Sequence, residues 1–178
     1  MNDSAAELDL ATTGIVIVDH GSRRAASNQM LEVFVEQFAP ESGYEIVEPA
    51  HMELAEPSIA TAFDRCVARG ATKVAVVPYF LSPGKHWHQD IPNITRDAAL
   101  KHPGVEFVVT APIGLNPMMK QVIATSVGYC LDQIQGKVEE CESCAGTGRC
   151  TLKTAEQADV VTSFRGGGDH GHAHGHDH

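Results

Sequence analysis

The strongest constraint on the fold is a repeated alternation of an apolar run with a segment of helical periodicity. The run "TGIVIVDHGS" (13–22) ends in a polar turn, and residues 27–39 then place five apolar side chains at helical spacing: Met30, Leu31, Phe34, Val35 and Phe38. The same order recurs with strand candidates at 44–53, 72–81 and 105–112 and helix candidates at 58–70, 89–102 and 117–134. Strands so rich in Val and Ile predict an α/β fold with an open, mainly parallel four-stranded sheet in a three-layer arrangement.

Single residues support the predicted helices. Gly70 stands where the helix at 58–70 should close, and Pro92 falls in the first turn of the next helix, where its missing N–H does no harm. Cys66 lies on the expected buried side of the helix at 58–70, so we interpret it as a packing residue.

The composition indicates one folded domain with appendages. A chain of 178 residues with 43% hydrophobic content can bury one full core but hardly two. We expect a flexible N-terminus at 1–12, an α/β domain at 13–135 and a cysteine-rich extension at 136–153. Residues 154–178 form a low-complexity, His-rich tail that we expect to be disordered.

Charge and hydropathy exclude several classes of partner. With 13 Lys and Arg against 23 Asp and Glu, the net charge of -10 argues against a broad nucleic-acid surface, and no run approaches the roughly 18 apolar residues of a membrane span. The acidic start "MNDSAAELDLATTG" has no arginine and no apolar segment, so it is typical of neither a secretory signal nor a transit peptide. We expect a soluble cytoplasmic protein, or one of the plastid stroma if the chain is the mature form of a plastid-targeted protein.

Polar side chains follow three of the predicted strands. His20 follows the first, His51 and Glu53 the second, and His86 and His88 the third. Ligands of parallel α/β sheets bind beyond the carboxyl ends of the strands, so these groups should collect at one edge. One strand-end histidine is more often structural than catalytic, but two at equivalent strand ends favour a functional site.

The candidate catalytic residues are His20, His86 and Glu53. A neutral imidazole binds a borderline divalent metal and also accepts a proton near neutral pH, and a nearby carboxylate can serve as a ligand or proton relay. His51 and His88 could equally be structural or support the ligands from behind.

A local cationic rim flanks the two key histidines. Arg23, Arg24 and Lys85 stand next to them, and Ser22 completes the candidate substrate-binding set. Arginine can grip a carboxylate with two parallel hydrogen bonds, which would suit an anionic ligand. The alternative is an ordinary set of solvated loop charges. Trp87 either covers an aromatic ligand or tucks under the helix at 89–102.

Four cysteines cluster near the C-terminal end: Cys130, Cys141, Cys144 and Cys150. In a reducing cytosol such a cluster is more typical of a metal site than of disulfides. Four thiolates suit either a structural zinc or an iron–sulfur cluster, and the spacing does not decide between them.

The tail alternates histidine with other residues: His170, His172, His174, His176 and His178. This composition favours storage or delivery of a divalent metal, with an expression tag as the alternative.

At "DHGSRR", "PAHMELAEPSIATAF" and "PYFLSPGKHWHQDIP" the sequence resembles the class II chelatases, small enzymes that insert a metal into sirohydrochlorin. The likeness runs from about Thr13 to Cys150 and is strongest to the SirB-type sirohydrochlorin ferrochelatases of siroheme synthesis in their plant form. It implies that His20 and His86 are the catalytic, metal-handling pair and that Glu53 shares their site. It also implies a 2Fe-2S cluster on the four cysteines and a homodimer. The His-rich tail departs from the plant form and looks like the extensions of cobalt-inserting, CbiX-like relatives, so the metal substrate is Fe²⁺ or Co²⁺.

The resulting hypothesis is a sirohydrochlorin chelatase, with Fe²⁺ insertion for siroheme as the first reading and Co²⁺ insertion toward cobalamin as the alternative. The cations and helix N-termini would hold the carboxylates of the tetrapyrrole. A competing class is a non-enzymatic metal-storage protein or metallochaperone, which explains the C-terminal segments but gives no reason for histidines at two strand ends.

Overall fold

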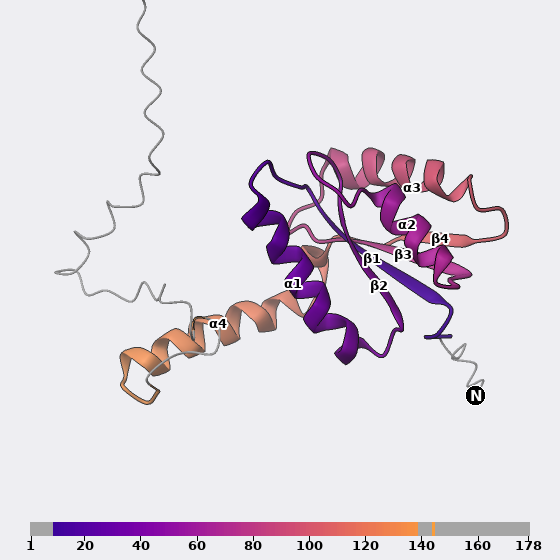
Figure 1. The fold of residues 1–178 in the computed structure, drawn as a ribbon. Coiled ribbons are helices and arrows are strands. Elements are labelled where there is room, and N and C mark those ends of the chain that lie inside the picture. The colour runs from indigo at the N-terminus through magenta and orange to yellow at the C-terminus, as the bar shows by residue number, and fades with distance from the viewer. Residues whose placement is uncertain (1–8, 139–143, 145–178) are drawn as a thin grey trace, which may run out of the picture. The chain divides into compact units, whose positions relative to one another are not determined.

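The fold is built on a four-stranded sheet with the strand order β2-β1-β3-β4 (Figure 1). The strands are β1 (Thr13–Asp19), β2 (Ile46–His51), β3 (Lys73–Pro78) and β4 (Glu106–Val109). All neighbouring strands pair in parallel. The computed structural model describes residues 9–138 and 144, and the predicted α/β sheet is confirmed.

Helices cover both faces of this sheet, as Figure 1 shows. Helix α1 (Ala25–Ser42) packs Leu31 and Val35 on one face, against Ile15 and Ile17 of β1. Helices α2 (Ile59–Ala68) and α3 (Ile91–Ala99) lie on the opposite face, where they enclose a second apolar cluster. Successive strand side chains point to opposite faces, so one short strand serves both cores. The predicted three layers are confirmed.

The local sequence explains where helix α2 begins and ends and which of its residues are buried. The Ser58 hydroxyl accepts a hydrogen bond from the Thr61 N–H at 3.3 Å and caps the helix, which ends at Ala68, two residues before Gly70. Phe63 and Cys66 on this helix are fully buried. Burial raises the pKa of the Cys66 thiol to about 12, so Cys66 packs as a small apolar residue, as predicted.

The segment after β3 differs from the sequence-based expectation. The pattern predicted a loop that carries His86 and His88, whereas His86–Asp90 form a π-helical turn, η1, that continues directly into α3. The Ile91 N–H donates to the His86 carbonyl, and Pro92, in the first turn of α3, has no N–H with which to extend a regular ladder backward. The wider turn therefore fits the proline that follows it.

The chain divides into two compact units, residues 1–120 and 121–178. Helix α4 (Met119–Ile134) contributes most of its length to the second unit and carries Cys130. Among the described residues, no helix is both long enough and apolar enough to cross a membrane. Cys141, Cys150 and the five tail histidines lie outside the described residues.

Candidate active site

Three candidate residues from three different strand ends lie together. His20 directly follows β1, Glu53 follows β2, and His86 opens the turn η1 after β3. The His20 Nε2 atom lies 3.0 Å from Glu53 Oε1, and the rings of His20 and His86 are 5.3 Å apart, edge to face. We call this group the His–Glu corner. It lies at the carboxyl edge of the sheet, where open parallel sheets bind their ligands.

The corner is open to solvent. The side chains of His20, Glu53 and His86 are 45%, 51% and 46% exposed. His20 Nδ1 lies 3.3 Å from the Gly21 carbonyl oxygen, and its Nε2 faces the Glu53 carboxylate. An incoming divalent ion can thus lie between the His20 Nε2 atom and the Glu53 carboxylate.

Asp90 orients His86, a role that the sequence pattern did not indicate. Its Oδ2 atom accepts from His86 Nδ1 at 2.8 Å, which leaves the lone pair of Nε2 available to an ion. Asp90 also lines a cavity of about 370 Å³ together with five other residues: Met52, Glu53, His86, Asn93 and Ile94. The four-residue spacing of His86 and Asp90 would have revealed the pair if the segment had been predicted as helical.

The other strand-end residues take separate positions. The Trp87 indole N–H donates to the Thr110 carbonyl at 2.9 Å, so Trp87 tucks against the end of β4. The exposed His88 lies against Trp87, with ring centroids 4.5 Å apart. His51 is fully buried and contacts Asp19. Of the five groups expected at the sheet edge, the structure thus brings His20, Glu53 and His86 together.

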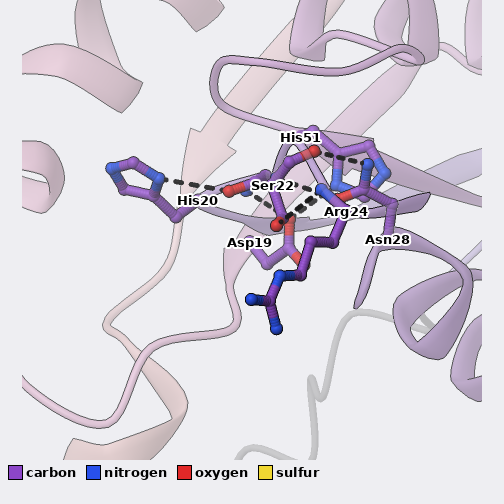
Figure 2. A network of polar contacts seen from close by, with 7 residues as sticks. Asp19, His20, Ser22, Arg24, Asn28 and His51 are labelled. Atoms are coloured by element: carbon purple, nitrogen blue, oxygen red, sulfur yellow. Dashed lines mark hydrogen bonds and ion pairs between the residues drawn. The ribbon is translucent and has the colours of Figure 1, made fainter. Parts of the chain in front are cut away.

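The cationic rim is present on the loops beside the corner. Arg23, Arg24 and Lys85 are exposed, and none of them forms an ion pair within the described part of the chain. Arg24 occupies the N-cap position of α1 without a side-chain cap bond, and its side chain leaves the loop in a different direction from the His20 ring (Figure 2). The Ser22 hydroxyl accepts from the Arg24 N–H at 3.1 Å. Ser22 therefore stabilises the turn that carries both arginines.

The backbone around Gly21 fixes how close His20 and Glu53 lie. Gly21 adopts φ +83°, and a Cβ atom at this position would lie 1.9 Å from the Glu53 carbonyl oxygen. The Glu53 N–H donates to the His20 carbonyl at 3.1 Å, which joins the two loops. Only glycine fits this turn without moving one loop away from the other.

The corner is not a closed metal cage. Within residues 9–138 and 144, no three or more His, Cys, Asp or Glu side chains are arranged to hold a metal ion. Two imidazoles and one carboxylate on an open edge are instead suited to an ion that must arrive, lose water and leave. A larger cavity of about 490 Å³, lined by residues of α1, β2 and α2 and their flanks, has no histidine or cysteine in its lining.

Comparisons with known proteins place these residues in a family. The CbiX family model matches residues 14–128. The sirohydrochlorin ferrochelatase of Arabidopsis thaliana chloroplasts is 53% identical over 139 residues, which cover 78% of this chain and 62% of that protein. The sirohydrochlorin cobaltochelatase of Methanopyrus kandleri is 28% identical, with 67% of this chain and 97% of that protein covered.

A solved structure agrees with the fold. The sirohydrochlorin chelatase SirB of Bacillus subtilis subspecies spizizenii, determined in complex with cobalt, superimposes with a TM-score of 0.61 and 32% identity. The match covers 68% of this chain and 50% of the SirB chain. The chain thus spans less than two thirds of the Arabidopsis protein and about half of the Bacillus one. The family model matches residues 14–128, which is more than half of this chain. The chain therefore belongs to the CbiX family, the group of class II chelatases that its motifs resemble.

Proposed function

We propose that this protein is a sirohydrochlorin chelatase that inserts a divalent metal ion, Fe²⁺ by first choice, into sirohydrochlorin for siroheme synthesis. The observation that carries the proposal is the His–Glu corner, where three separate strand ends deliver two imidazoles and a carboxylate. The Arabidopsis relative, named a ferrochelatase, supports iron as the ion.

The chemistry of insertion matches these groups. The ion must shed water, and the tetrapyrrole must lose two N–H protons for each ion that enters. In the proposed mechanism, His20 and His86 receive the ion through ring nitrogens. Glu53, 3.0 Å from His20 Nε2, takes up protons together with one of the histidines. The open corner lets a flat macrocycle approach the ion from the solvent side.

Substrate binding is assigned to the cationic rim. Sirohydrochlorin carries carboxylates around its edge, and Arg23, Arg24 and Lys85 offer exposed cations without internal partners among the described residues. The N-terminus of α1 adds backbone N–H groups beside Ser22. Because the cations are local, the net charge of -10 need not repel the substrate beyond a Debye length of about 8 Å.

The experiment that tests the proposal measures metal insertion from the change in tetrapyrrole absorption under anaerobic conditions. Wild type is compared with His20→Ala, His86→Ala and the control His102→Ala, whose histidine lies after α3 and pairs with Asp64 of α2. We expect both corner variants to lose insertion and the control to keep it. Folded corner variants that insert metal at the wild-type rate would contradict the proposal.

Cobalt insertion toward cobalamin is the second candidate. It is favoured by the Methanopyrus relative, which is named a cobaltochelatase and is covered over 97% of its length. Rates with Fe²⁺, Co²⁺ and Ni²⁺ on the same tetrapyrrole decide between the candidates. Tight metal binding without turnover on any tetrapyrrole would favour the non-enzymatic storage reading instead.

The C-terminal cysteines are proposed to hold a 2Fe-2S cluster. Four thiolates are a donor set that suits iron–sulfur clusters, and Cys130 and Cys144 are the two members that lie among the described residues. The cluster is assigned no part in the insertion step. Visible absorption and EPR of anaerobically purified protein test for it, and Cys130→Ser should weaken the signal.

The proposed assembly is a homodimer in a soluble compartment. The chain corresponds to about half of the SirB chain, so two copies would supply what the longer protein contains in one. The chloroplastic name of the Arabidopsis relative supports the plastid stroma over the cytoplasm. Light scattering at assay concentration measures the assembly. Deletion of residues 169–178 tests metal delivery by the tail. If the tail delivers metal, the shortened protein should insert metal more slowly only when the free metal concentration is low.

A further inference from the structure

A buried histidine lies directly behind the His–Glu corner. His51 is 0% exposed and is the last residue of β2, paired across the ladder with Asp19, the last residue of β1. Its Nδ1 lies 2.6 Å from Asp19 Oδ1 (Figure 2). A carboxylate accepts hydrogen bonds, so Nδ1 carries the proton and donates it. This contact fixes the tautomer of the ring.

The second nitrogen of this ring makes no hydrogen bond. Within the described part of the chain, Nε2 of His51 is the buried side-chain polar atom without a partner. Leaving such an atom unsatisfied costs free energy that an apolar side chain of similar volume would avoid. Packing alone therefore does not account for a histidine at this position, and its contact with Asp19 must supply the reason.

Asp19 transmits that contact to the corner. The same Oδ1 atom that accepts from His51 also accepts from the Gly21 N–H at 2.9 Å. The Asp19 carbonyl accepts from the Met52 N–H at 2.9 Å, next to the His20–Glu53 backbone bond. The carboxylate thus fixes the turn that carries His20, against the strand end that carries Glu53. Its side chain is 26% exposed, so His51 limits its freedom to rotate toward solvent.

We propose that Asp19 and His51 are positioning residues that hold His20 and Glu53 at the separation needed to share an ion. His51 acts only through Asp19, and Asp19 acts through the Gly21 turn. This inference rests on the proposed function, because it assigns the pair to the same corner. The pair supplies buried contacts to a turn whose functional side chains, His20 and Glu53, are themselves about half exposed.

Three substitutions distinguish a role in positioning His20 and Glu53 from a contribution to folding stability alone. His51→Leu fills the space but removes the donor, whereas His51→Asn keeps an amide N–H where Nδ1 stood. Asp19→Ala removes the oxygen that accepts from both His51 Nδ1 and the Gly21 N–H. The matched control is Thr95→Val, because Thr95 is equally buried and, among the described residues, its hydroxyl bonds only to the Ile91 carbonyl in α3.

The readouts are thermal unfolding, affinity for Co²⁺ from its ligand-field absorption, and kcat and KM for insertion into sirohydrochlorin. Loss of a residue that orients a metal ligand typically lowers affinity or activity by about 10–100-fold. We expect a loss of that size in Co²⁺ affinity and kcat for His51→Leu and Asp19→Ala, with KM for sirohydrochlorin unchanged. His51→Asn should retain most of the wild-type Co²⁺ affinity and kcat. Thr95→Val should lower only the unfolding temperature.

Wild-type Co²⁺ affinity and kcat in a folded His51→Leu protein would overturn the inference, as would equal losses in His51→Leu and His51→Asn. If His51→Leu does not fold, Asp19→Ala decides by the same criterion. Failure of the proposed function looks different: the wild type itself would insert no ion into sirohydrochlorin. The Co²⁺ affinities of the variants would still show whether the pair positions the corner.

Discussion

Replacing Gly21 by alanine should damage the corner far more than it damages the fold. Gly21 has φ +83°, and an added Cβ would lie 1.9 Å from the Glu53 carbonyl oxygen. Real Cβ contacts essentially never fall below 3.0 Å, so the two loops must separate by about 1.1 Å, the difference between these distances. A misplacement of about 1 Å can cost on the order of 100-fold in rate, so we expect insertion by Gly21→Ala to fall by about that factor.

Gly43→Ala is the matched control for this substitution. Gly43 ends helix α1 with φ +77°, and an added Cβ would meet only the tip of Leu10, at 3.5 Å. Both variants therefore carry a similar left-handed strain of about 1–2 kcal/mol, but only Gly21→Ala moves the corner. For a protein of this size each kcal/mol lowers the unfolding temperature by about 2–4 °C.

The assay combines thermal unfolding with the initial rate of sirohydrochlorin metallation. Gly43→Ala should unfold a few degrees below wild type and insert metal at the wild-type rate. Gly21→Ala should unfold at a similar or lower temperature and lose insertion. A folded Gly21→Ala protein with the rate of Gly43→Ala would refute the claim that this turn sets the spacing of His20 and Glu53.

Three further predictions concern single groups. Asp90→Asn should lower kcat by about 10–100-fold with little change in KM for sirohydrochlorin, because it disturbs the orientation of His86. Steady-state kinetics measure both constants, and an unchanged kcat would count against this role of Asp90. Hydrogen bonds from the Ser58 N–H and the Thr61 hydroxyl lower the pKa of Glu56 below its ordinary value of 4.5. Glu56→Gln should therefore unfold at a lower temperature than wild type at pH 7, and this difference in unfolding temperature should disappear as the pH falls below 4.5. A difference that persists in acid would contradict this origin. Because burial raises the pKa of Cys66 to about 12, maleimide at pH 7 should label this thiol in denatured but not in native protein. Peptide mass spectrometry detects the label, and labelled Cys66 in native protein would contradict its burial.

The fold was predictable because its signals are local and repeated. The apolar run of β1 and the helical spacing in α1 and α2 give element types directly, and parallel pairing follows from their alternation. The approach of His20, Glu53 and His86 was also accessible, since carboxyl ends of parallel strands share an edge whatever the strand order.

What the sequence did not reveal depends on geometry between elements. The role of Asp90 follows from η1 being helical, and that turn depends on Pro92 and on packing that one sequence does not display. His51 lies in the strand–loop sequence near Glu53, yet the ladder turns its side chain into the core toward Asp19. Trp87 was expected to cover a ligand or to tuck under the helix that follows, and its bond to the Thr110 carbonyl, 23 residues further on, instead places it at the end of β4.

The most direct test of the His–Glu corner is a double-mutant cycle on metal insertion. The initial rate of Fe²⁺ insertion into sirohydrochlorin is measured for wild type, His20→Ala, His86→Ala and the double variant, with folding checked by circular dichroism. Residues that act on one ion as a unit give strongly non-additive losses, so the double variant should be no slower than the worse single one. Losses that multiply would indicate two independent roles, and wild-type rates in the folded variants would contradict the assignment of the corner.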